Sequence, residues 1–190
     1  MPSNIQRARW ASAKVPDSRL AQIGKIVDRI MANAERYKAV DAMTGVPWYV
    51  IAGLHNMESG GSFLCHLHEG SSLTGRTKFE PKGRPLTGLP PFTWHESAID
   101  ALKFDAMDKV KWSSLEETLA ACERYNGTGY LRYHPTVMTP YLWAKTSIET
   151  PGKYIADGRW SAIARSEQVG IAAIWKVMEQ RGILDFSKLT

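Results

Sequence analysis

Residues 47–63 read PWYVIAGLHNMESGGSF, an apolar run that ends in a carboxylic acid and a pair of glycines. Proline suits the first turn of a helix, and Ile51, Leu54 and Glu58 recur at helical spacing, so the pattern predicts a buried helix with Glu58 on its apolar face. Partial desolvation there should raise the pKa of this carboxyl group and keep some of it protonated near neutral pH. Glu58 is therefore our candidate general acid, and an exposed glutamate at a helix end is the alternative.

The composition is that of one globular domain with a basic surface and many aromatic rings. The chain has 190 residues, a formal net charge of +5, seven Trp and seven Tyr. This length predicts a single domain over residues 1–190, in which residues 1–16 could form a flexible arm. The basic residues are scattered, so we expect an anionic cell-wall polymer as partner rather than nucleic acid. The surplus rings suit a binding surface, since carbohydrate and nucleobase ligands both use them.

Apolar residues at three- and four-residue spacing predict a mainly helical α+β fold. Helices are expected from Asp17 towards Ala34, from Thr93 through Leu102, from Ser114 to Tyr125, from Thr139 through Trp143, and from Ser166 to Gly182. Residues 60–91 are rich in Gly and Pro, and an irregular segment of that length is usually functional. We expect it to contain a small hairpin and to form one wall of a binding cleft.

Two further groups of residues could complete a glycosidase site. Cleavage of a glycosidic bond needs a protonated acid on one side and a carboxylate or a held water on the other, about 5 to 9.5 Å apart. Glu69 could be the second carboxylate and Thr74 could orient a water, although a solvated loop glutamate and a structural threonine are the common alternatives. Tyr125, Asn126 and Tyr130 supply a stacking ring and amide hydrogen bonds, as an N-acetylated sugar requires. The alternative for them is an ordinary Asn-Gly helix end.

Together these motifs resemble the lysozyme-like superfamily, which includes phage lysozymes and soluble lytic transglycosylases. The resemblance covers about residues 44–180. It rests on Glu58-Ser59-Gly60-x-Ser62-Phe63, His66-Leu67-His68, Gly83-Arg84-Pro85, Pro90-Pro91-Phe92-Thr93-Trp94, Tyr125-Asn126-Gly127-x-Gly129-Tyr130, Pro140-Tyr141-Leu142-Trp143 and Gly152-Lys153-Tyr154. It implies a lysozyme-like fold that cleaves peptidoglycan glycan strands between N-acetylmuramic acid and N-acetylglucosamine. Glu58 would then be the acid, Tyr125 and Asn126 would line the cleft, and no cofactor is implied.

The sequence departs from that family at the second catalytic group. Glu69 follows Glu58 by 11 residues and Thr74 follows Glu69 by five, which is not the spacing of phage lysozymes. The Gly-Leu-Met-Gln motif of transglycosylases is also missing after Glu58, which favours hydrolysis over the anhydro-forming reaction without excluding it. A non-catalytic module that binds cell wall or chitin is the remaining alternative, although such a module needs no buried acid.

A metal site is weighed because one region is crowded with possible ligands, namely His55, Glu58, Cys65, His66 and His68. The chain has no His-Glu-x-x-His motif or comparable ligand set. Lone histidines in polar loops more often make ordinary hydrogen bonds. We therefore expect no metal.

Cysteine usage and the first residues bear on where the protein is made. Cys65 and Cys122 form no CxxC pair, which suggests folding in a reducing cytoplasm, with one disulfide as the alternative. The basic residues near the start are followed by no apolar segment, so neither a secretory signal nor membrane insertion is expected. The sequence thus predicts a monomeric enzyme made in the cytoplasm that reaches the wall after release or delivery, as a phage endolysin or a secreted effector does.

Overall fold

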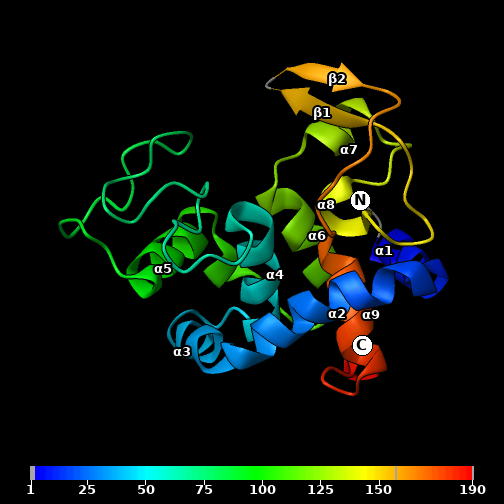
Figure 1. Cartoon of the computed structure of the whole chain (residues 1–190), viewed down its shortest axis with the longest axis horizontal. Coiled ribbons are helices and arrows are strands. Elements are labelled where there is room, and N and C mark those ends of the chain that lie inside the picture. The colour runs from blue at the N-terminus through cyan, green and yellow to red at the C-terminus, as the bar shows by residue number, and fades with distance from the viewer. Residues whose placement is uncertain (1–2, 157, 190) are drawn as a thin grey trace. The chain divides into compact units, whose positions relative to one another are not determined.

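The computed structural model describes residues 3–156 and 158–189, and within them the fold is α+β and mainly helical, as predicted (Figure 1). The helices are α1 (Ser3–Ser12), α2 (Asp17–Ala32), α3 (Ala34–Thr44), α4 (Trp48–Ser59), α5 (Trp94–Phe104), α6 (Leu115–Tyr125), α7 (Gly129–Tyr133), α8 (Pro140–Trp143) and α9 (Ile171–Gln180). Two short 3-10 helices are η1 (Met107–Lys109) and η2 (Phe186–Lys188). The strands β1 (Lys153–Ala156) and β2 (Arg159–Ser161) pair antiparallel, with Tyr154 opposite Trp160.

The chain, expected to form one domain, divides into two compact units. The first unit joins Met1–Arg29 to Trp112–Thr190, and the second is Ile30–Lys111. Glu58, Glu69 and Thr74 belong to the second unit. The other predicted site residues, Tyr125, Asn126 and Tyr130, belong to the first.

In the second unit α3 packs against both α4 and α5. The end of α3 and the start of α4 are joined through one residue, Asp41. Its carbonyl accepts the N–H of Gly45, which has a left-handed φ of 71°, and its carboxylate accepts the N–H of Trp48 at 3.0 Å. Tyr37, Leu54 and other fully buried side chains lie at the centre of this unit. This packing fixes the orientation of α4 and thereby the position of Glu58 at its end.

The segment between α4 and α5 contains a reduced form of the predicted small hairpin. Cys65 and Ser72 form an isolated antiparallel bridge. The N–H of His66 donates to the Ser71 carbonyl at 2.7 Å, and that of Leu73 donates to the Leu64 carbonyl at 3.0 Å. The chain therefore reverses direction around Glu69, although no strand of the regular kind forms there.

In the first unit α1 packs on α6, and α8 packs on both α6 and α9. Trp10 of α1 is buried, and its ring meets that of Phe186 edge-on at 5.0 Å. Residues 3–12 are thus a packed helix in the region where the sequence allowed a flexible arm. Among the described residues no helix is long and apolar enough to cross a membrane.

Helix starts that the sequence marks with capping residues are confirmed in three places. Thr93 and Glu96 form a full capping box at α5. The Ser114 side chain accepts the N–H of Glu117 at α6, and Pro140 is the first residue of α8. The Thr93 and Ser114 side chains satisfy N–H groups that the first helical turn leaves unpaired. Proline at the start of α8 instead has no N–H to satisfy.

Other boundaries were predicted wrongly. The predicted long first helix is interrupted at Asn33, so that α2 and α3 are separate helices. Asparagine favours caps and turns over helix interiors. The last helix begins at Ile171 rather than near Ser166. Before it, the Gly170 N–H donates to the Ala144 carbonyl at 3.1 Å, which holds this stretch against the end of α8. The β1–β2 hairpin was not predicted at all.

Candidate functional site

Glu58 lies in the last turn of α4, where it is half-buried after a run of buried residues, 50–57. The helix ends at Gly60, whose φ is 62°, and Gly61 continues in the same left-handed region with a φ of 77°. Residues other than glycine adopt this backbone conformation only at a cost in free energy. The two glycines therefore turn the chain sharply just beyond the candidate acid.

His55 fixes the turn that follows Glu58. Its Nε2 lies 3.0 Å from the Ser62 carbonyl oxygen, which can only accept, so Nε2 carries the proton. Its Nδ1 then accepts from the Tyr37 hydroxyl of α3 at 2.9 Å. The His55 ring also packs on Phe63 and on Trp94. Because its position depends on two hydrogen bonds inside the core, His55 is a positioning group for the turn.

The chain reversal around Glu69 is packed directly on the end of α4. Gly70 has a φ of 81°, and a Cβ atom built on it would lie only 2.5 Å from the Glu58 carbonyl oxygen. A side chain of any size is excluded there, because the backbone of Gly70, the residue after Glu69, packs against the Glu58 carbonyl oxygen. Two glutamates 11 residues apart in sequence are thus brought onto adjacent pieces of main chain.

The Glu69 carboxylate has unequal surroundings at its two oxygens. Oε1 accepts a hydrogen bond from the Ser71 hydroxyl. Oε2 is buried and has no partner among the described residues. A buried acceptor of this kind ordinarily holds a water or a ligand donor. Glu69 is therefore not the solvated loop glutamate that the sequence offered as the alternative.

Thr74 lies just beyond the reversal and is exposed. Its hydroxyl is 2.9 Å from the Ser72 hydroxyl. The structure thus places it on the same short segment as Glu69, with its side chain engaged by a neighbouring serine.

The remaining histidines of this segment tie it to α5. His66 donates from Nε2 to the Gly75 carbonyl and shares a 2.8 Å hydrogen bond with Ser97. His68 Nε2 is 2.9 Å from Asp100, which also receives two hydrogen bonds from Arg84. Burial is the largest effect on His68 and lowers its pKa, against the raising effect of Asp100.

These histidines are thus structural anchors. Within residues 3–156 and 158–189 no group of three or more His, Cys, Asp or Glu side chains is placed to hold a metal ion. Cys65 and Cys122 are both free thiols, and burial raises the pKa of Cys122.

The predicted sugar-binding residues lie where α6 ends. Tyr125 is half-buried and is the last residue of α6, and Asn126 is exposed. Gly127 follows with a φ of 97°, which turns the chain towards α7. Tyr130 is half-buried, and its ring meets those of Tyr154 and of other aromatic residues edge-on. Burial raises the pKa of Tyr130.

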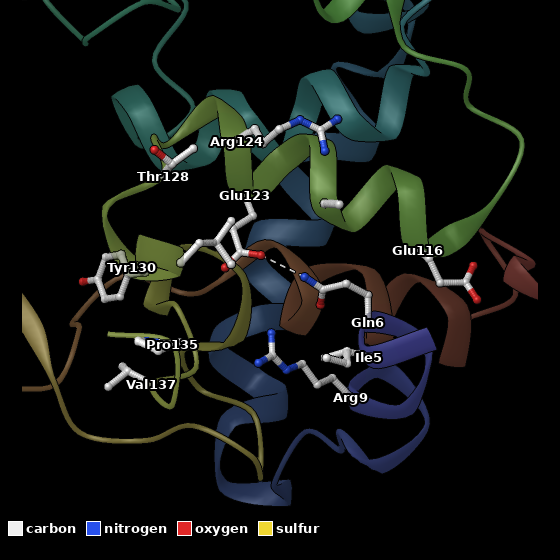
Figure 2. A pocket seen from close by; sticks show the side chains of 12 residues that line it. Ile5, Gln6, Arg9, Glu116, Glu123, Arg124, Thr128, Tyr130, Pro135 and Val137 are labelled. Atoms are coloured by element: carbon white, nitrogen blue, oxygen red, sulfur yellow. Dashed lines mark hydrogen bonds between the residues drawn. The ribbon is translucent and has the colours of Figure 1, made fainter. Parts of the chain in front are cut away.

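A pocket of about 230 Å³ opens beside Tyr130 within the first unit (Figure 2). It is lined from α1, α6, α7 and the chain after α7 by Ile5, Gln6, Arg9, Glu116, Ala120, Glu123, Arg124, Thr128, Tyr130, Leu131, Pro135 and Val137. Glu123 is 3 % exposed and accepts a 2.8 Å hydrogen bond from the Gln6 amide. Burial, the largest effect, raises the Glu123 pKa, while Arg9, Gln6 and Arg124 lower it.

Sequence reasoning missed this pocket, although one signal was present. Glu116, Ala120 and Glu123 recur at helical spacing and therefore share one face of α6. Gln6 and Arg9 gave no signal because α1 was not predicted. Only the packing of α1 on α6 brings these side chains together.

No protein-family model, no curated protein and no solved structure matches this chain. The lysozyme-like fold and its cleft stay predictions from the sequence resemblance. The function is therefore argued from the geometry around Glu58 and Glu69.

Proposed function

We propose that this chain is a muramidase that cleaves the β-1,4 bond between N-acetylmuramic acid and N-acetylglucosamine in peptidoglycan. The observation that carries the proposal is the packing of Gly70 on the Glu58 carbonyl oxygen. Glu69 precedes Gly70, so this contact supports a second carboxyl group on a segment packed against the end of α4. Glycosidic cleavage needs two carboxyl groups about 5 to 9.5 Å apart, and we assign Glu58 and Glu69 to these roles.

In this mechanism Glu58 gives its proton to the leaving oxygen while the bond to the anomeric carbon breaks and positive charge develops on the sugar ring. Glu69 acts as the base. Its Oε2, buried without a partner among the described residues, takes a proton from the water that attacks the anomeric carbon. Thr74 is assigned to orienting that water. This route inverts the anomeric centre.

Within the first unit, a sugar contact is assigned to the residues at the end of α6. The Asn126 amide can donate to and accept from an acetamido group, and the rings of Tyr125 and Tyr130 can pack against a sugar face. Since peptidoglycan lies outside the cytoplasm, we assign the enzyme to action after release or delivery, as an endolysin or a secreted effector.

The first test is Glu58→Gln in a turbidity assay on permeabilised Gram-negative cells. The amide keeps the shape of the side chain but carries no acidic proton, and loss of a general acid should lower the rate by at least about 10² to 10⁴. Glu80→Gln, an exposed glutamate of the segment between α4 and α5, is the matched control and should lyse cells at the wild-type rate. A Glu58→Gln variant with a third of wild-type activity contradicts the assignment.

Mass spectrometry of the released fragments defines the reaction. Hydrolysed reducing ends support the muramidase. Fragments with 1,6-anhydro ends would identify a lytic transglycosylase instead, with Glu58 still the acid. Binding to purified cell wall without any released fragment would identify a non-catalytic module.

A further inference from the structure

The pocket in the first unit has no part in the proposed chemistry. Of the six site residues predicted from the sequence, Tyr130 alone lines it. Its volume of about 230 Å³ suits a small molecule rather than a polymer chain. What the pocket would bind can be argued from the polar groups that face it.

The Gln6 side chain leaves a hydrogen bond to be made. Gln6 is 7 % exposed, and its Nε2 donates to Glu123. Its Oε1 is buried and has no partner within the described part of the chain. Figure 2 shows the Gln6 amide beside the Glu123 carboxylate, joined by that one hydrogen bond. Two acceptors side by side call for a donor, and one of them is a carboxylate, so a positively charged donor suits the pair best.

Arg9 supplies the opposite charge. It lies on α1 three residues after Gln6 and is half-buried in the pocket lining. Figure 2 shows its guanidinium on the same side of the pocket as the Gln6 amide, whereas the Arg124 guanidinium points away from the Gln6–Glu123 pair. Among the described residues Arg9 makes no side-chain hydrogen bond and no close ion pair, although its charge acts on Glu123 at longer range and lowers the Glu123 pKa. Its guanidinium is thus available to a carboxylate, which it can bind through two N–H groups.

The rest of the wall is apolar in part, and Glu116, Arg124, Thr128 and Tyr130 also line it. Ile5, Leu131, Pro135 and Val137 line it together with Ala120. A ligand that matches all three features carries a cation, an anion and a short hydrocarbon group. A neutral sugar offers no charge to either Glu123 or Arg9. A simple anion would satisfy Arg9 but would place a negative charge beside Glu123.

We propose that this pocket binds a free α-amino acid with an apolar side chain. The ammonium group donates to Gln6 Oε1 and to the Glu123 carboxylate, the α-carboxylate accepts from Arg9, and the side chain packs on the apolar wall. This site shares Tyr130 with the proposed sugar-binding residues but contains none of Glu58, Glu69 and Thr74, so either assignment can fail without the other.

The experiment is calorimetric titration of the full chain with L-leucine and two matched probes. N-acetyl-L-leucine lacks the ammonium group and L-leucinamide lacks the carboxylate. We expect L-leucine to bind and each probe to bind at least about tenfold more weakly, because each loses one charge-assisted contact. No binding of L-leucine at millimolar concentration, or equal binding of all three, overturns the proposal.

Variants assign the two charges to residues. Arg9→Met should weaken L-leucine binding by about tenfold or more and leave L-leucinamide binding unchanged, since only the carboxylate uses Arg9. Arg132→Met, an exposed arginine of α7 outside the pocket lining, is the matched control and should bind as wild type.

Glu123→Gln should remove the preference for L-leucine over N-acetyl-L-leucine. Should this buried substitution prevent folding, judged by circular dichroism, the Arg9→Met result decides alone. Amide shifts on L-leucine addition should lie in α1, α6 and α7. Shifts confined to other elements overturn the assignment of the site, as does wild-type binding by Arg9→Met.

Discussion

Two acids of this molecule, Glu58 in the second unit and Glu123 in the first, occupy contrasting positions. Glu58 sits in the last turn of α4 and is half-buried, with left-handed glycines following it and the backbone of Gly70, the residue after Glu69, against it. Glu123 is 3 % exposed on one face of α6 and is held by an amide from a residue 117 positions away. Glu58 stands at the end of a helix, just before a sharp turn of the chain. Glu123 is instead covered by another helix, α1.

The comparison teaches that burial of an acid does not by itself define a catalytic site. Glu123 is the more deeply buried of the two, and burial raises its pKa. The group packed beside it is an amide. Only Glu58 has a second carboxyl-bearing residue fixed next to it, and this is why the proposed hydrolysis is assigned there.

The largest expected effect tests whether that second carboxyl group acts in the reaction. Glu69→Gln keeps an acceptor for the Ser71 hydroxyl but removes the base, so it should slow lysis nearly as much as Glu58→Gln, by about 10² or more. Anomer analysis by NMR should show inversion. Near-wild-type lysis by Glu69→Gln would show that no second carboxyl group acts beside Glu58, and the contrast with Glu123 would then be lost. A retained anomer would require the two carboxyl groups to lie about 5 Å apart.

The next effect tests the contact that joins the two glutamates. Gly70→Ala combines a positive φ with a Cβ atom 2.5 Å from the Glu58 carbonyl oxygen. We expect a loss of about 1 to 3 kcal/mol in the free energy of unfolding, and slower lysis because Glu69 shifts away from Glu58. Chemical denaturation and the turbidity assay measure the two effects.

Two glycines of the same segment separate strain from close packing. Gly83 has a similar φ of 82° but open space around it, and Gly75 has open space and an ordinary φ. Gly83→Ala should therefore lower stability by about 1 to 2 kcal/mol without slowing lysis, and Gly75→Ala should change neither. Wild-type lysis by Gly70→Ala would show that the reaction does not depend on this contact.

Much of the fold could be predicted because helix starts are encoded locally. Thr93 and Glu96 carry their own hydrogen-bond partners three residues apart, and the structure pairs them as expected. The β1–β2 hairpin has no such signal. It is held to α7 by aromatic contacts, including His134 stacked on Trp160 at 3.4 Å, and these form only after the chain has folded.

The candidate site likewise has residues that the sequence reveals and residues whose role only the folded chain reveals. Glu58 could be found because its helix, its apolar face and its glycines are contiguous in sequence. The role of Gly70 could not be found, since a glycine in a Gly-rich segment does not reveal which carbonyl will approach it. Likewise His66 and His68 suggested possible metal ligands, whereas their partners on α5, Ser97 and Asp100, are about 30 residues further along the chain.

A smaller effect concerns the sugar-binding assignment at the end of α6. Asn126→Ala should weaken turnover by the loss of one hydrogen bond, worth about 0.5 to 1.5 kcal/mol. Because Asn126 is exposed, the melting temperature of the variant should stay near that of the wild type. A variant that melts far lower while turning over substrate normally would show that Asn126 only ends the helix.

The smallest effect is a pH dependence of stability that belongs to Glu123. Burial raises its pKa in the folded protein above the ordinary value of 4.5, so the native state holds this proton more tightly than the unfolded chain. The stabilising contribution is complete below the ordinary value and is lost as the pH rises through the raised value.

Glu116 acts in the opposite direction, because its hydrogen bond from Arg7 lowers its pKa and its contribution is lost as the pH falls. The wild-type curve combines these with other groups, among them Asp105, whose pKa burial raises to about 6. The difference between variant and wild type isolates Glu123. We expect the free energy of unfolding of Glu123→Gln to fall less than that of the wild type between pH 4.5 and 7. Denaturation at a series of pH values measures this difference. Parallel curves would mean that Glu123 is no more protonated in the folded state than in the unfolded chain, and the contrast in burial between the two acids would then have no consequence for their protonation.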